Sequence, residues 1–248
     1  MSSEIGESNV EQIVQSLTAH WKTVDVSELV PSQFPEATAY VLADPYAFLV
    51  ACSFDRGMKA ELTWSIPYAL NQLLSPLSAK KVSSLSIDEL KDLISKLPIK
   101  PRYTNDAPKT LHDLAVLVMK EGQGDASKLW SHNSALRFQR LFSQVHGVGP
   151  GIAAMAAILV ERFWKVEFTD RAFMDVKPDV HVQRVMFRLG LIAEQTEAHA
   201  LLAARELMPL CPGDIDSPLW HIGRTWCFSS KPDCPGCPLD ALCSKAGL

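Results

Sequence analysis

The chain has 248 residues, of which 47% are hydrophobic and 21% charged, the balance of a globular protein with one large domain or two small ones. It has no run of about 18 apolar residues and no signal-peptide pattern at its N-terminus, so we expect no membrane contact and a cytoplasmic, nucleoid-associated location. The net charge of −4 argues against a generally basic nucleic-acid surface, so any nucleic-acid contact must rest on a local site.

Helical periodicity begins near the N-terminus and continues along the chain. Ile13, Leu17 and Trp21 recur at every fourth position, which predicts an amphipathic helix with these side chains on its buried face. Ser86 followed by Glu89 has the pattern of a capping box and predicts the start of another helix.

The second half of the chain keeps this helical character. Residues 109–122 and 197–210 predict helices that end at Gly122 and Pro209. Because alternating apolar and polar runs are few and prolines fall between the helical segments, we expect an all-α protein. Residues 161–180 are the least periodic stretch and are predicted to connect two helical lobes.

A glycine-rich stretch, VHGVGPGIA, lies within residues 142–160 between two predicted helices, the first ending near Val145. Gly147, Gly149 and Gly151 expose backbone amides, and the following helix start reinforces them with its dipole. Such a turn can hold a phosphate without a basic side chain. The alternative is a tight helix–helix corner in which glycine only permits close packing.

Four of the six cysteines crowd into the segment from position 227 to position 243: Cys227, Cys234, Cys237 and Cys243. In a reducing compartment, clustered cysteines mark a metal or a catalytic site more often than disulfides. Their gaps of six, two and five residues favour one iron–sulfur cluster, because structural zinc sites usually join two closely spaced pairs. Zinc and disulfides stay open as alternatives.

The glycine turn and the cysteine segment together resemble the endonuclease III superfamily of DNA glycosylases. VHGVGPGIA resembles its helix-hairpin-helix element, the cysteine spacing matches its [4Fe–4S] loop, and PDVHVQRVMFRLGL resembles a helix that opens with an aspartate. The resemblance implies an all-α protein of two helical lobes. A helical barrel would cover residues 45–165, with the helix-hairpin-helix at 142–160, and a cluster lobe would combine residues 1–44 with 166–248.

The resemblance implies a base excision repair enzyme that hydrolyses the N-glycosidic bond of a damaged or mismatched base. It places the catalytic carboxylate at Asp179 and leaves Asp170 as a minor candidate. The alternative for Asp179 is a structural role in which it only caps the helix. Gly151 occupies the position at which bifunctional members carry a nucleophilic lysine, so the resemblance implies an enzyme without lyase activity. The segment 164–178 is longer than in short family members, and its role is not predicted.

The expected partner is double-stranded DNA containing such a base, bound by a monomer. The resemblance implies DNA contacts from the hairpin, from the cluster loop, and from a segment that fills the gap left by a flipped base. The residues assigned to these contacts are Gly147, Val148, Gly149, Gly151, Lys231 and Arg56. For each charged side chain in this set, the alternative is an ordinary surface charge with no role in binding. A catalytically inactive DNA-binding protein and an iron–sulfur electron-transfer protein are the alternative functions.

Overall fold

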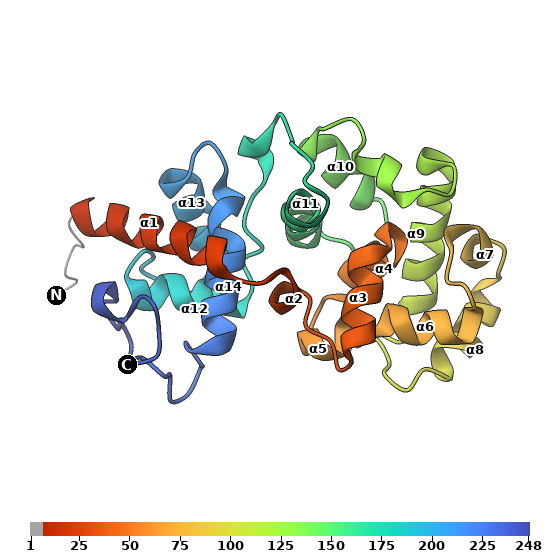
Figure 1. Cartoon of the computed structure of the whole chain (residues 1–248), viewed down its shortest axis with the longest axis horizontal. Helices are drawn as coiled ribbons and strands as arrows, with labels where there is room; N and C mark the ends of the chain where they lie inside the picture. The colour runs from red at the N-terminus through yellow and green to blue at the C-terminus, as the bar shows by residue number, and fades with distance from the viewer. Residues whose placement is uncertain (1–6) are drawn as a thin grey trace. The chain divides into compact units, whose positions relative to one another are not determined.

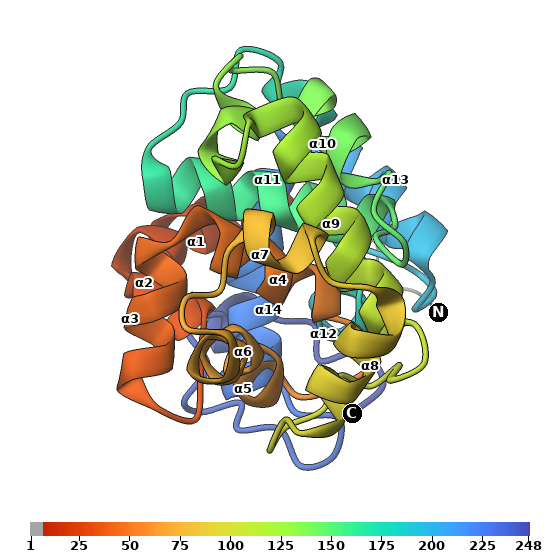
Figure 2. The same cartoon turned by 90° about the vertical axis from the view of Figure 1, so that its right-hand side faces the viewer.

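A computed structural model describes residues 7–248, with side chains from residue 9 onward (Figures 1 and 2). This part of the chain contains 14 α-helices and four short 3-10 helices, and no strand, which confirms the predicted all-α class. The helices form two compact units. One is the continuous segment Val26–Thr169, and the other combines residues up to Asp25 with Asp170–Leu248.

The division between the units differs from the predicted lobes, because residues 26–44 belong with the central unit. Helix α3 (Pro35–Ala43) packs against α4 (Pro45–Phe54) and α6 (Ile66–Leu74). Its inward residues Ala37 and Val41 are fully buried. Burial against the central helices therefore places this segment, which sequence periodicity alone could not assign to either unit.

The central unit wraps short helices around the apolar helices α4 and α11. Helices α7 and α8 lie beside α9, and α10 packs against α11 (Figure 2). The other elements of the unit are α2 (Val26–Leu29), α5 (Ala60–Thr63), α7 (Ala79–Ser83), α8 (Ile87–Ser95), α9 (Ala107–Gly122), η1 (Ala126–Trp130), α10 (Ala135–Phe142) and α11 (Pro150–Trp164). Phe48 of α4 lies 4.9 Å from the Trp164 ring and 6.0 Å from the Trp64 ring, so aromatic packing joins α4 to the end of α11.

Two of the predicted helix ends are confirmed by their capping bonds. The Ser86 hydroxyl accepts from the Glu89 amide at 3.2 Å, and the Glu89 carboxylate accepts from the Ser86 amide at 2.7 Å. This is a complete capping box. Helix α9 ends at the predicted Gly122, where Gln123 adopts a left-handed φ of 55° and stops the helix.

The second unit joins segments from opposite ends of the described chain. Helix α1 (Glu7–Thr23) packs against α14 (Asp216–Thr225), and α14 packs against α12 (Val180–Leu189), as Figure 1 shows. Ile13 and Leu17 are fully buried in this core, as their spacing predicts. The remaining elements are η2 (Arg171–Phe173), α13 (Glu197–Leu207), η3 (Pro212–Ile215) and η4 (Asp240–Leu242).

No single helix of the described residues has both the length and the apolarity to cross a bilayer. Helices α3 and α4 reach that length only as a pair, and the pair is bent by 113°.

Candidate functional site

Asp179 caps the N-terminus of α12 with one oxygen of its carboxylate. Oδ1 accepts from the amide of His181 at 2.8 Å and from the amide of Val182 at 3.0 Å. The residue is half-buried, and its neighbour Val180 is 68% exposed. Since both bonds go to Oδ1, the carboxylate is held in one orientation while Oδ2 is left for another partner.

The same geometry occurs at Asp44, which caps α4 in the other unit. Its Oδ1 accepts from the amides of Tyr46 at 2.8 Å and Ala47 at 3.0 Å. A capping aspartate followed by two amide donors is therefore a local structure that this chain uses twice. Capping geometry alone does not distinguish a catalytic carboxylate from a structural one.

A buried arginine connects the start of α12 to the first cysteine of the cysteine segment. Arg184 is 9% exposed, and its guanidinium donates to the carbonyls of Cys227 at 2.7 Å, Gly223 at 2.8 Å and Val180 at 3.1 Å. Burial lowers the pKa of Arg184, while Cys227 acts in the opposite direction. Because arginine keeps its charge even when buried, it acts as a fixed cross-link between three backbone segments.

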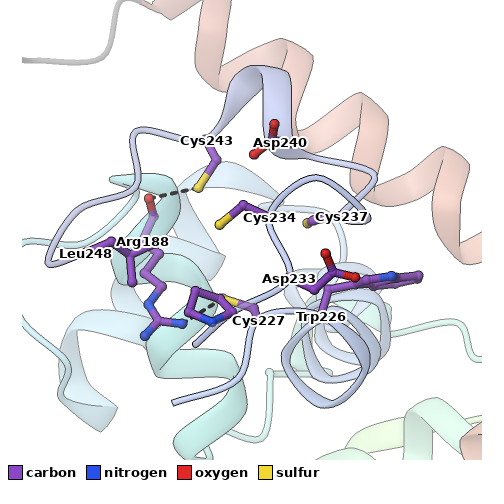
Figure 3. Close-up of a pocket in the computed structure, with 10 residues that line it drawn as sticks. Arg188, Trp226, Cys227, Asp233, Cys234, Cys237, Asp240, Cys243 and Leu248 are labelled. Carbon is purple, nitrogen blue, oxygen red and sulfur yellow. Dashed lines mark hydrogen bonds between the residues drawn. The ribbon is translucent and has the colours of Figure 1, made fainter. Parts of the chain in front are cut away.

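The four cysteines of the 227–243 segment line one pocket of the second unit (Figure 3). The pocket encloses about 280 Å³ of empty space, including the part open to solvent, and Arg188 and Trp226 also contribute to its wall. All four side chains are free thiols, so no disulfide forms within the segment.

Arg188, one helical turn after Arg184, ties both ends of this cysteine segment to α12. Its Nη1 lies 3.3 Å from the Cys227 sulfur and donates to the Phe228 carbonyl at 2.6 Å. Its own carbonyl accepts from the Cys243 thiol at 3.2 Å and from the Ser244 hydroxyl at 2.9 Å. The first and last cysteines are thus fixed to one residue of a buried helix.

The thiols of this pocket influence one another electrostatically. Burial raises the pKa of Cys237 to about 11, and the proximity of Cys227, Cys243 and Cys234 adds to the increase. Burial also raises the pKa of Cys243. A positively charged metal group would relieve this cost, because thiolates are the form that binds metal.

Within residues 7–248, no group of three or more His, Cys, Asp or Glu side chains converges closely enough to hold a single metal ion. Cys227, Cys234, Cys237 and Cys243 line the same pocket, and four cysteine thiolates are the ligand set that a [4Fe–4S] cluster takes.

The glycine-rich stretch forms a tight turn between α10 and α11. Helix α10 ends at Phe142 rather than near Val145, because two further turns follow: the Val145 amide donates to the Phe142 carbonyl and the Val148 amide donates to the Val145 carbonyl. Gly147 has a φ of +83°, a conformation that favours glycine. Gly149 is the N-cap of α11, and a Cβ there would meet no atom within 4 Å.

The predicted hairpin residues therefore differ in what they offer to a ligand. Val148 is 6% exposed and its amide is already bonded within the turn. Gly151 lies in the first turn of α11, where backbone amides have no acceptor inside the helix. Gly151 also leaves this helix start without a side-chain amine.

Arg56, predicted to reach toward DNA, lies against the hairpin turn of its own unit. A Cβ on Gly147 would fall 2.5 Å from Cζ of Arg56 and still closer to both terminal nitrogens. The structure places Lys231 on the cysteine segment of the second unit, exposed and with a φ of 53°. Asp170, the minor catalytic candidate, precedes the three-residue helix η2, and its carbonyl accepts from the Phe173 amide.

Sequence reasoning missed Arg184 and Arg188, the two residues that organise the second unit's site. Both are buried charged side chains of α12. Their spacing of four residues places them on one face of α12, but this face lies roughly opposite the apolar positions of the helix, where charged residues ordinarily indicate a solvated surface. The sequence pattern therefore gave no signal of their burial.

No family model matches the chain. Its fold resembles solved structures of endonuclease III in a trapped covalent intermediate with DNA (TM-score 0.64, 16% identity, covering 95% of this chain and 96% of that one) and in a non-covalent DNA complex (TM-score 0.65, 16% identity, 98% and 97%). It also resembles a thermostable thymine-DNA glycosylase (TM-score 0.62, 18% identity, covering 96% of each chain).

One curated relative matches over a shorter region. An adenine DNA glycosylase of Arabidopsis thaliana is 34% identical over an alignment of 85 residues that covers 31% of this chain and only 14% of that protein. The solved structures match along nearly the whole chain. The chain therefore has the same all-helical fold as these endonuclease III and thymine-DNA glycosylase structures.

Proposed function

We propose that the protein is a DNA glycosylase that hydrolyses the N-glycosidic bond of a damaged or mismatched base in double-stranded DNA. The observation that carries the proposal is the fold, which resembles solved structures of endonuclease III and of a thymine-DNA glycosylase along nearly the whole chain. Asp179 opens α12 at the position that the resemblance implies for the catalytic carboxylate. The endonuclease III fold, whose solved examples include DNA complexes, supports DNA as the partner.

Asp179 would act on the sugar of a nucleotide extruded from the duplex. As the bond to the base breaks, positive charge develops on the sugar ring, and a fixed carboxylate stabilises that charge or orients water against it. The amides of His181 and Val182 prevent the carboxylate from turning away. Such preorganisation means that the side chain need not reorient during the reaction.

The proposed reaction stops at base release. A lyase step requires an amine that attacks the sugar and forms a Schiff base. At the position where the resemblance implies that lysine, the chain has Gly151, which has no side chain. We therefore expect an abasic site as the product, with water rather than a lysine completing the reaction.

We further propose that Cys227, Cys234, Cys237 and Cys243 hold a [4Fe–4S] cluster. The group would supply four metal–sulfur bonds that cross-link the cysteine segment. Arg188 would orient the first and last ligands through the contacts already present at the Cys227 sulfur and the Cys243 thiol. Lys231, exposed on the same segment, would then be held where it can meet a phosphate.

The test compares Asp179→Asn with Asp44→Asn in duplexes that each contain one lesion: uracil, an alkylated purine, an oxidised pyrimidine or a mismatch. Asparagine retains a side-chain oxygen for the cap, and both aspartates make the same two bonds. We expect base release, revealed by alkaline strand cleavage, from at least one lesion. We expect Asp179→Asn to abolish it and Asp44→Asn to retain it.

A catalytically inactive DNA-binding protein is the second candidate, and the match between the Asp179 and Asp44 caps favours it. Under this alternative, Asp179 only stabilises α12. Tight duplex binding without base release from any lesion would support it against the proposed enzyme. Equal base release by the two asparagine variants would instead contradict the catalytic role of Asp179. Borohydride trapping gives a further check, because a covalent adduct would contradict an enzyme without lyase activity.

A further inference from the structure

Arg56 has an unusual position in the central unit, because its guanidinium lies directly over the glycine of the hairpin turn. The residue follows α4, where its amide donates to the Phe54 carbonyl at 2.8 Å and fixes the backbone. The side chain then reaches the Gly147 Cα so closely that a single methyl group there would collide with Cζ and both terminal nitrogens. Only glycine leaves room for this contact.

Two other side chains hold Arg56 in this position. Its Cζ lies 4.8 Å from the centre of the Tyr103 ring, within the range of a cation–π contact. Its Nη2 lies 3.5 Å from the hydroxyl of Thr110, which is fully buried on α9. That hydroxyl donates to the His146 carbonyl at 2.8 Å, immediately before Gly147. The arginine is therefore linked to the turn both directly and through α9.

The charge of Arg56 is not used in an ion pair among the described residues. Asp106, whose carboxylate lies beside this turn, is 3.5 Å from Nε2 of His146. Arg56 is held by the Tyr103 ring, the Thr110 hydroxyl and the backbone of the turn. Its guanidinium therefore supports the conformation of the turn. This matters because Arg56 was expected, from the resemblance, to fill the gap left by a flipped base.

We propose that Arg56 is a positioning residue for the hairpin: it holds the left-handed Gly147 turn in place and so sets the direction of the amides at the start of α11. This inference rests on the proposed function for its DNA-binding consequence. Arg56 and Gly147 then act as a pair, because the guanidinium occupies the space that a side chain on Gly147 would fill.

A double-mutant cycle tests the inference through duplex affinity. Arg56→Met removes the planar group, and Gly147→Ala puts a methyl where that group lies. Alanine at Gly147 also bears the strain of its left-handed φ, which is the same with and without Arg56. If both variants break the same contact, Arg56→Met alone weakens binding to an undamaged duplex about tenfold, and the double variant is not appreciably weaker than Gly147→Ala alone. Effects that multiply in the double variant would show that the two residues act independently, and would overturn the proposal.

Two further measurements separate positioning from insertion into the duplex. Hydrogen exchange of the Val148 amide, which bonds to Val145 inside the turn, should speed up in Arg56→Met but not in Arg140→Met, a loss of charge at an exposed site near the end of α10. Fluorescence of 2-aminopurine beside the target base, at saturating protein, should still rise with Arg56→Met. Unchanged exchange together with a lost fluorescence rise would assign insertion to Arg56 instead.

The exchange measurement needs no DNA, so it remains informative if the protein binds none. In that case the proposed function fails, while faster Val148 exchange still supports the positioning role within the fold. If Arg56→Met does not fold, Arg56→Lys replaces it, because lysine keeps the charge but lacks the planar face that covers Gly147. Exchange in Arg56→Lys that equals the wild type would contradict the proposal.

Discussion

Gly223 of α14 lies directly against His181 of α12, the helix that Asp179 caps. A Cβ at this position would lie 2.8 Å from the Cβ of His181 and 3.2 Å from its Cα. The second atom belongs to the backbone of α12, which cannot rotate away as a long side chain can. Gly223→Ala should therefore push α12 and α14 apart.

The expected cost follows from overpacking a buried contact, about 1 to 3 kcal/mol. For a chain of this size each kcal/mol lowers the melting temperature by about 2 to 4 °C, so a decrease of about 2 to 12 °C is expected. Gly122→Ala is the matched control. It lies in α9, where the nearest atoms to a new Cβ are 3.8 and 3.9 Å away. Alanine there should be neutral or stabilising by up to about 1 kcal/mol.

Thermal unfolding and urea titration of the three proteins measure these effects. Base release gives a second measure, because the His181 amide that Gly223→Ala would displace is one of the two donors to Asp179. We expect Gly223→Ala to reduce base release at temperatures at which it is still folded. A melting temperature equal to that of the wild type, or equal losses in Gly223→Ala and Gly122→Ala, would refute the reasoning from helix contact.

Three other changes test separate parts of the structure. Hydrogen bonds from Ser86 lower the pKa of Glu89, so its stabilisation is present above the ordinary glutamate pKa and is lost as the pH falls through the lowered value. Melting curves of Glu89→Gln should thus fall below the wild type near pH 7 and converge with it in acid. Arg184→Met leaves the buried Gly223 carbonyl and the part-buried carbonyls of Cys227 and Val180 without this donor, and should cost roughly 1 to 3 kcal/mol in urea unfolding. Cys237→Ala should remove iron and absorbance near 400 nm, whereas Cys52→Ala, at a buried thiol outside the pocket, should retain both; equal iron in the two variants would exclude the proposed cluster.

Local patterns in the sequence predicted the helices well where one helix start or one face determines the structure. The Ser86–Glu89 capping box and the buried stripe of Ile13 and Leu17 are examples. Each depends on residues within a few positions of one another, so chain spacing carries the information.

The boundary of the central unit could not be predicted in the same way. Residues 26–44 have helical character in either assignment, and only packing of α3 against α4 and α6 decides between them. That packing depends on contacts across many residues, which helical periodicity does not encode.

The contacts around the candidate site also could not be predicted from local sequence patterns. Arg56 and Gly147 are 91 positions apart, and nothing in either segment indicates that one lies over the other. Arg184 and Arg188 donate hydrogen bonds to carbonyls of a segment about 40 residues away. These hydrogen bonds offset the cost of burying the two charges.

The second unit is discontinuous, and this has a consequence for the order in which the protein is made. The central unit is one continuous segment, so it can fold as soon as Thr169 has been synthesised. Helix α1 emerges first, yet its buried residues Ile13 and Leu17 have their packing partners only after Asp170. At about 5 to 20 residues per second, these apolar side chains wait on the order of ten seconds or more for α12 and α14. During synthesis, the apolar face of α1 therefore stays without its packing partners until the chain beyond Asp170 has been made.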